Sequence, residues 1–330
     1  MSISARNEHA QPAQSPSARS PLLNAITVDV EDWGQSVVNP DCPLTDLFRA
    51  NTDKILEAFA RHDVRGTFFV LGLAAEKAPD VVRAIAAAGH EVQSHGYGHR
   101  WVHTQTPAAF RADVDRSKKL LEDMIGRSVT GYRAPAFTII RESLWALDIL
   151  AETGFQYDSS IFPLRARWYG ITGAPWYPHR LRTPSGAMVT EIPVASYRVL
   201  GRRIPAGGGG YLRLAPSMLF SAAIRQINRA GHNATIYMHP HEFGAPDFDQ
   251  YASPVSWRTK LHQGIGRRGF PAKIEYLLKT FRFGTICDAV GDPHRLPLHE
   301  YDTASPGRIA RTKARWSAAR PSAGSLRGIS

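Results

Sequence analysis

The sequence predicts an α/β fold in which helices cover a largely parallel β-sheet, either open or closed into a barrel. Short apolar runs rich in β-branched and aromatic residues alternate about seven times with longer stretches of helical periodicity between residues 22 and 290. Hydrophobic residues make up 43% of the 330 residues and charged residues 21%. This balance is typical of a globular chain and excludes a fibrous or wholly disordered protein.

The first predicted strand covers residues 24–30, where the sequence NAITVDV is nearly all apolar and ends in acidic residues. Such a continuous run is typical of a strand buried on both faces. Further strands are predicted at 66–71, 90–94, 129–132, 155–158, 190–194, 234–238 and 283–290.

The clearest predicted helix covers residues 106–126. Thr106 can cap its first amides, Pro107 suits the first helical position, and Gly126 provides a stop. Other helices are predicted at 45–62, 74–88, 141–154, 216–230 and 274–281. The run Gly207–Gly210 lacks the spacing of a phosphate-binding loop, and we interpret it as a flexible lid or turn.

Much of the net charge of +11 lies at the C-terminal end, since residues 303–330 carry six Arg or Lys residues and no acid. We expect a disordered N-terminal segment at 1–21, one domain at 22–302 and a basic disordered tail at 303–330. The tail makes a specific nucleic-acid partner a weak interpretation of the charge. Peripheral contact with a membrane surface through the tail is the alternative.

The cysteines and the N-terminal residues predict a cytoplasmic protein. Cys42 and Cys287 are far apart in sequence and form no CxxC motif, so both are expected to be reduced. The first 20 residues are polar and lack the apolar run of a signal peptide. No apolar run reaches the ~20 residues that a transmembrane helix needs.

Polar residues with catalytic potential follow successive predicted strands. They are Asp29, Glu31, Asp32, His95, His99, Arg133, Asp158 and His239. The carboxyl ends of parallel strands open on one face, where active sites are built in barrels. We therefore expect these side chains to converge, although up to ~200 residues separate them.

The pair His95 and His99 has the spacing of two ligands to one ion. Two neutral imidazoles and one carboxylate, with positions left for water, describe a catalytic Zn²⁺ or Fe²⁺ site. Acids crowded at a strand end need a positive neighbour, which a metal ion and Arg133 would supply. His239, followed by Pro240, is either a general acid or a capped loop residue.

Five segments in order carry a family resemblance. They are Thr27-Val28-Asp29-Val30-Glu31-Asp32, His95-Gly96-Tyr97-Gly98-His99, Arg133-Ala134-Pro135, Tyr157-Asp158-Ser159-Ser160 and Tyr237-Met238-His239. Together they resemble the motifs of the polysaccharide deacetylase superfamily, which includes the nodulation chitooligosaccharide deacetylases. The sequences DVEDW and HPHE are most similar to the subfamily found in bacterial exopolysaccharide loci.

This resemblance implies a single-domain, distorted (β/α) barrel of about seven parallel strands and a hydrolase that removes N-acetyl groups from an amino-sugar polymer or oligosaccharide. It implies one divalent ion, Zn²⁺ or another transition metal, on His95, His99 and a carboxylate. Asp29 would be the base and His239 the acid, with Arg133 holding Asp29 and Asp158 assisting His239.

The chain departs from the family pattern at three places. Val30 replaces the usual metal-binding Asp, which leaves Glu31, favoured by related members, or Asp32 as the carboxylate ligand. Gly96 replaces a Ser or Thr that normally steadies the histidine loop, and Tyr237 replaces a Leu at the acetyl pocket.

Three other functions compete with deacetylation. Related folds hydrolyse cyclic amides, as imidases and allantoinases do. A catalytically inactive carbohydrate-binding protein is also conceivable, but binding alone needs no acid–base pair. Nucleic-acid binding depends only on the basic tail.

Overall fold

The computed structural model describes residues 21–164, 169–245, 247–251 and 255–301. Its centre is a ten-stranded, mostly parallel sheet in the order β10-β1-β2-β3-β4-β5-β7-β6-β12, with β11 also paired to β1. The strands are β1 Asn24–Val30, β2 Thr67–Val70, β3 Glu91–Ser94, β4 Gly131–Tyr132, β5 Tyr157–Asp158, β6 His179–Arg182, β7 Met188–Glu191, β10 Thr235–Met238, β11 Phe283–Gly284 and β12 Leu298–Glu300. A separate antiparallel hairpin joins β8 Ser196–Val199 and β9 Arg202–Pro205.

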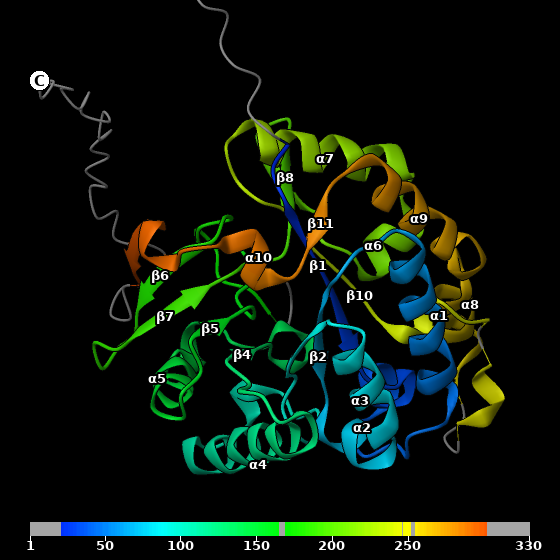
Figure 1. Ribbon diagram of the computed structural model, residues 1–330, viewed down its shortest axis with the longest axis horizontal. Helices are drawn as coiled ribbons and strands as arrows, with labels where there is room; N and C mark the ends of the chain where they lie inside the picture. The colour runs from blue at the N-terminus through cyan, green and yellow to red at the C-terminus, as the bar shows by residue number, and fades with distance from the viewer. Residues whose placement is uncertain (1–20, 165–168, 246, 252–254, 302–330) are drawn as a thin grey trace, which may run out of the picture.

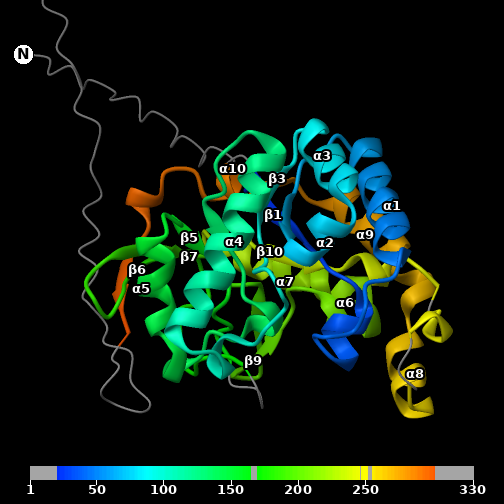
Figure 2. The same cartoon turned by 90° about the horizontal axis from the view of Figure 1, so that it is seen from below.

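Helices surround the sheet (Figure 1). They are α1 Leu47–Arg61, α2 Gly72–Lys77, α3 Pro79–Ala87, α4 Pro107–Ile125, α5 Trp145–Glu152, α6 Gly209–Leu214, α7 Ser217–Arg229, α8 Trp257–Gly264, α9 Phe270–Thr280 and α10 Ile286–Val290. In the view from below, α4 and α5 lie on the side of β5 and β7, and α1–α3 lie on the other side (Figure 2). The prediction of an α/β fold with a parallel sheet is confirmed.

The β1 strand is the centre of the molecule. All seven of its residues are buried, and it pairs in parallel with β10 and β2. Val28 and Val30 belong to the main hydrophobic core, whereas the alternating residues Thr27 and Asp29 lie on the opposite face of the strand. This alternation lets one strand support both the core and a polar interior.

Strand pairing does not close the sheet into a complete barrel among the described residues, because β10 and β12 are its ends. Main-chain hydrogen bonds cross the gap between the segment after β7 and β10. The amide of Ala195 donates to the carbonyl of Thr235 at 2.8 Å, and the amide of Tyr237 donates to the carbonyl of Gly207 at 2.6 Å. Irregular chain therefore completes the wall that a further strand pair would have formed.

The glycine run 207–210, interpreted from the sequence as a flexible lid or turn, is part of this wall, where Gly208 forms a β-bridge with Tyr237. Gly208 has a φ of +150°, and a Cβ on it would lie 1.7 Å from the carbonyl oxygen of Tyr237. Helix α6 then begins at Gly209. The glycines are needed because two backbones approach closely here.

Other boundaries also differ from the predictions. The predicted helix 74–88 is two helices, which meet at Ala78 and Pro79 because proline cannot continue α2. The predicted strand 283–290 has only two strand residues, because the Thr285 hydroxyl accepts from the amide of Asp288 and starts α10.

The predicted terminal segments lie outside the described residues, except Pro21. In the described part of the chain, no helix has the length and apolarity needed to cross a membrane.

Replacing Gly208 by Ala should destabilise the fold strongly, because the new methyl group meets the Tyr237 backbone. We expect the free energy of unfolding to fall by about 3 kcal/mol or more. Gly186→Ala is the matched control, since Gly186 has a φ of +92° but open space around its Cβ position. Its backbone strain alone should cost about 1 kcal/mol. Denaturant titrations that give equal losses for both variants would contradict the proposed role of Gly208.

Candidate active site

Five polar residues gather at the carboxyl ends of neighbouring strands, and His99 joins them from the loop after His95. Asp29 and Glu31 come from the end of β1, which lies between β10 and β2 in the sheet. His95 follows β3 and Arg133 follows β4, while His239 follows β10 on the other side of β1. Parallel pairing brings these strand ends to one mouth, as the sequence predicts.

Glu31, His95 and His99 form a compact group of metal-ligating atoms. Glu31 Oε2 lies 3.2 Å from His95 Nε2 and 2.6 Å from His99 Nε2. All three side chains are buried, and their ligand atoms lie within 4.8 Å of one another.

The protonation of this group suits a divalent cation. His95 Nδ1 lies 2.9 Å from the carbonyl oxygen of Arg133, to which it donates, so Nε2 is the ring nitrogen left for an ion. Burial alone would raise the pKa of Glu31, but His99 and His95 hold it well below its ordinary value. A carboxylate and two imidazoles are a typical donor set for Zn²⁺ and similar ions, with coordination positions left open.

The loop between the two histidines is held by Asp113, a residue that the sequence analysis missed. Its carboxylate accepts hydrogen bonds from the amides of Tyr97 at 2.7 Å and Gly98 at 3.1 Å. Gly96 has a φ of +75°, and a Cβ there would lie 2.9 Å from Asp113 Oδ2. Asp113 therefore steadies the loop in which Gly96 replaces a hydroxyl residue.

Asp29 is held by a fully buried guanidinium. Arg133 Nη1 donates to Asp29 Oδ1 at 2.7 Å and to Thr27 Oγ1 at 2.8 Å, while Nη2 donates to Ser159 Oγ at 2.9 Å. The guanidinium also lies 4.2 Å from the centre of the Phe69 ring. With Oδ1 engaged by Arg133, Oδ2 is the oxygen through which Asp29 can accept a proton.

His239 is paired with Glu242, a second residue that the sequence analysis did not assign. Glu242 Oε2 accepts from the backbone amide of His239 at 3.0 Å and lies 3.3 Å from its Nδ1. The other ring nitrogen, Nε2, lies 3.6 Å from Glu31 Oε1. Burial lowers the pKa of His239, but Glu242, together with Glu31 and Asp29, outweighs it and raises that pKa to about 9.

Comparison with known proteins identifies the architecture around this site. Residues 40–157 match the family model for polysaccharide deacetylase, and residues 159–291 match one described as a domain of unknown function (DUF3473). The peptidoglycan deacetylase of Helicobacter pylori is 26% identical over 257 residues, which are 70% of this chain and 77% of that protein. These matches support membership of the polysaccharide deacetylase superfamily. This superfamily consists of hydrolases that act on amide bonds.

Other curated relatives match shorter segments of the chain. The peptidoglycan-N-acetylglucosamine deacetylase of Bacillus cereus is 33% identical over 98 residues, 29% of this chain and 36% of that protein. The chitooligosaccharide deacetylase of Sinorhizobium fredii is 38% identical over 65 residues, 20% of this chain and 28% of that protein. The chain thus spans only about a third of the length of these two relatives.

Solved structures show the same fold at low sequence identity. A Mycobacterium smegmatis protein assigned as a polysaccharide deacetylase has a TM-score of 0.54 at 21% identity, covering 84% of this chain and 91% of its own. The allantoinase PuuE has a TM-score of 0.55 at 16% identity, covering 82% and 91%. At these identities the likeness concerns the fold alone.

Asp32, the alternative carboxylate ligand, lies outside the metal-ligating group. Its Oδ1 accepts from the hydroxyl of Tyr251 at 2.7 Å, and its Oδ2 accepts from the amide of Thr45. Among the described residues, the group that could hold an ion at this position contains Glu31 and not Asp32.

Asp158 forms a buried pair with Glu191, its partner on the neighbouring strand, whereas the carboxylate beside the His239 ring is Glu242. Burial raises the pKa of Asp158 to about 6. The pKa of Glu191 is raised well above its ordinary value, first by burial and then by the negative charge of Asp158. Two such groups share one proton. Ser159, the residue directly after β5, is the one that contacts Arg133. Successive residues of an extended chain point to opposite faces, so Asp158 and Ser159 point to different sides of the sheet.

Substituting Glu31 by Gln or His99 by Ala should weaken divalent-metal affinity at least ~100-fold. Even the loss of a residue that only orients a metal ligand lowers metal affinity by about 10–100-fold. Asp32→Asn is the matched control and should keep nearly full metal affinity. Elemental analysis and titration calorimetry measure both. Loss of the ion from Asp32→Asn with retention in Glu31→Gln would reverse the assignment.

Proposed function

We propose that this chain is a metal-dependent hydrolase that removes N-acetyl groups from an amino-sugar oligosaccharide or polymer. One observation carries the proposal: a carboxylate held by Arg133 and an imidazole held by Glu242 flank the same metal-ligating group. Amide hydrolysis needs a proton acceptor for water and a proton donor for the amine. Membership of the superfamily, and the deacetylase names of its relatives, support the acetylated sugar as substrate.

Glu31, His95 and His99 would hold the ion. When bound, Zn²⁺ or another divalent ion polarises an acyl oxygen and lowers the pKa of water. Asp29 Oδ2 accepts the proton of the attacking water, while the ion pair with Arg133 orients the Asp29 carboxylate. The amide carbon then carries the new C–O bond.

His239 completes the reaction by donating its Nε2 proton to the sugar nitrogen as the C–N bond breaks. An amine leaves far more readily than an amide anion, so this proton is needed. Glu242 favours the charged imidazole and directs Nδ1 toward itself, which leaves Nε2 for the substrate. The products are acetate and a free amino sugar.

Exopolysaccharide and chitooligosaccharide are the substrates we propose to test first, and a cyclic amide is the competing substrate class. Acetate release from N-acetylglucosamine oligomers and from a bacterial exopolysaccharide, with and without chelator, should be compared with ring opening of hydantoin or allantoin. Ring opening without acetate release would replace the proposed substrate class. A chelator-insensitive acetate release would contradict the metal dependence.

Asp29→Asn should lower kcat/KM for acetyl-sugar hydrolysis by ~10² or more, the usual worth of a positioned base, while the metal is retained. His239→Ala should impair amide hydrolysis more than hydrolysis of an activated acetate ester, because a good leaving group needs less protonation. Asp29→Asn should impair both substrates alike. If His239→Ala affects amide and ester equally, His239 is not the proton donor.

Glu242→Gln should move the alkaline limb of the kcat/KM profile to lower pH. His239 with its raised pKa of about 9 is protonated, and therefore competent as an acid, below that pH. Removing the neighbouring negative charge lowers the pKa, by about one unit or more for an opposite charge at this distance. An unchanged alkaline limb, with normal metal content and thermal stability, would exclude Glu242 from this role.

A further inference from the structure

The end of the sheet opposite the active site carries an exposed apolar tip. The β8–β9 hairpin turns at Leu200 and Gly201, and the Leu200 side chain is 98% exposed. Its φ of +47° is a conformation that glycine or asparagine adopts far more readily. The fold therefore holds a large apolar side chain in water, in a turn that disfavours it.

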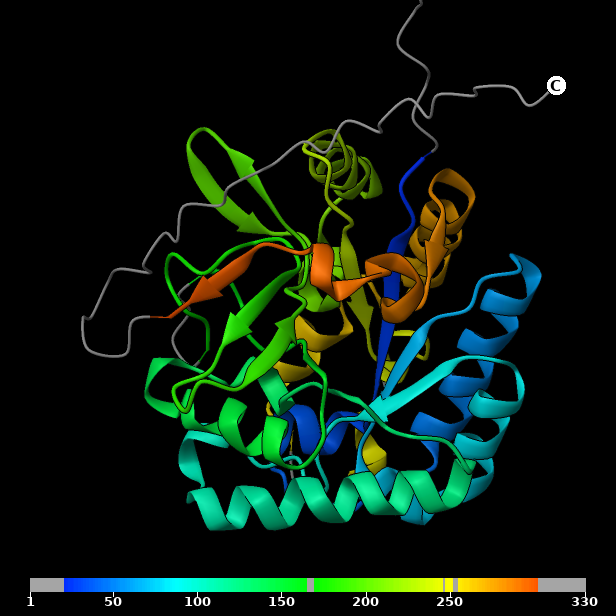
Figure 3. The same cartoon turned by 60° about the vertical axis from the view of Figure 1, so that its left-hand side comes forward.

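The hairpin is attached to α7. The amide of Arg198 donates to Gln226 Oε1 at 2.8 Å, and Gln226 Nε2 donates back to the carbonyl of Arg198 at 3.1 Å. Met218, at the start of α7, is 75% exposed. Leu200 and Met218 thus lie on two elements that are bonded to each other. In Figure 3 the hairpin and α7 lie at the same end of the molecule as the first residues of β1.

A basic cavity of about 1000 Å³ lies at the other end of α7. Four exposed cationic side chains line it: Arg225, Arg229, Lys279 and Arg282. Among the described residues that line the cavity, Asp63 is the one acid. Its apolar wall includes Leu278 and Phe281.

We propose that this surface, the docking face, binds the headgroup layer of an anionic membrane. It consists of Arg198, Leu200, Met218, Arg225, Arg229, Lys279 and Arg282. Basic side chains attract phosphate headgroups, and an apolar tip gains free energy when it enters the acyl boundary. Charge complementarity thus points to an anionic lipid surface.

The charge of the docking face argues against two other occupants. A second copy of the chain would bring the same cations together across a two-fold interface, and they would repel. A soluble phosphate or polyanion could use the cations but would gain nothing from Leu200.

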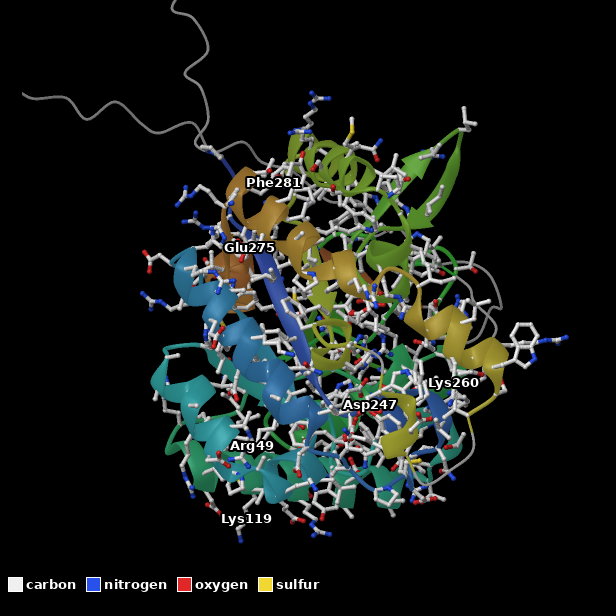
Figure 4. All side chains as sticks on the ribbon, turned by 90° about the vertical axis from the view of Figure 1, so that its right-hand side faces the viewer. Arg49, Lys119, Asp247, Lys260, Glu275 and Phe281 are labelled. Atoms are coloured by element: carbon white, nitrogen blue, oxygen red, sulfur yellow. The ribbon has the colours of Figure 1, made fainter. Side chains whose placement is uncertain are left out.

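The position of the docking face suits an enzyme that works on polymer at a membrane. The face lies beside the first residue of β1, Asn24, whereas Asp29 and Glu31 lie at the far end of the strand. Docking would therefore leave the mouth of the active site turned toward the solution. In Figure 4, Phe281 lies at one end of the molecule and Lys119 at the other.

Vesicle binding of the full chain tests the proposal. Sedimentation should show binding to vesicles in which about a third of the lipid is phosphatidylglycerol, little binding to phosphatidylcholine vesicles, and a decline with salt. The double variant Arg225→Glu/Arg229→Glu should bind at least ~10-fold more weakly, because each basic residue contributes about fivefold near such a surface and two contribute about 25-fold. Leu200→Asp should also weaken binding, and its exposed position leaves the fold unaffected.

Matched controls make the same chemical changes elsewhere on the surface. Lys119→Glu reverses an exposed charge on α4, and Leu261→Asp replaces a leucine on α8 that is 58% exposed. Both should bind vesicles like the unaltered chain, and all variants should keep the same melting temperature. A further variant, Leu200→Cys in a Cys287→Ser background, carries an environment-sensitive dye on the new thiol. The dye should report an apolar environment only when anionic vesicles are present.

Two results would overturn the proposal. If the docking-face variants bind anionic vesicles as well as the controls do, another part of the chain, such as the basic residues 303–330, makes the contact. If light scattering shows a dimer that Leu200→Asp dissociates, the face is an interface between two copies. Vesicle binding needs no turnover, so a failure here is distinguishable from a failure of the proposed hydrolase activity.

Discussion

The candidate active site depends on satisfying one buried charge, the guanidinium of Arg133. It is fully buried, and such a cation is tolerated only with an opposite charge and well-placed acceptors. Asp29, Thr27 and Ser159 supply them from β1 and from the chain after β5. Removing one partner of a buried pair of this kind typically costs about 3–5 kcal/mol.

The backbone of Arg133 connects that charge to the metal-ligating group. Its amide donates to the carbonyl of Ser94 at 3.0 Å, and its carbonyl accepts from His95 Nδ1 at 2.9 Å. One residue therefore holds the proposed base with its side chain and selects the tautomer of a metal ligand with its main chain. A change in the position of β4 would therefore disturb the hold on Asp29 and the orientation of His95 together.

The sequence was sufficient to predict where the site lies, because parallel strands bring their carboxyl ends together. It left the choice between Glu31 and Asp32 open, since the direction of a side chain just beyond a strand depends on how the chain turns there. Glu242 and Asp113 were missed for a related reason. Each acts through backbone amides of a short loop, and such contacts leave no periodic signal in the sequence.

Where sequence and structure disagree, backbone proximity is the physical reason in several cases. The glycine run 207–210 has the composition of a mobile loop, yet Gly208 packs against the Tyr237 carbonyl where no side chain fits. The strand predicted at 283–290 is apolar enough to be buried, but the Thr285 cap makes most of it helical. Apolar composition predicts burial only for residues 283–290, and in each segment a local cap or a close contact decides the conformation.

The placement of Asp158 shows how strand alternation divides the acidic residues between two tasks. Asp158 and Glu191 are adjacent across a parallel pair, and both are fully buried, so full ionisation of the two would be costly. A carboxyl group that shares a proton with its neighbour is a weak partner for an imidazolium. Glu242, three residues after His239, pairs with it directly, with 3.3 Å between Glu242 Oε2 and His239 Nδ1. The charged partner of the proposed acid is therefore supplied locally by the loop after β10, and the strand pair β5–β7 is left to stabilise the sheet.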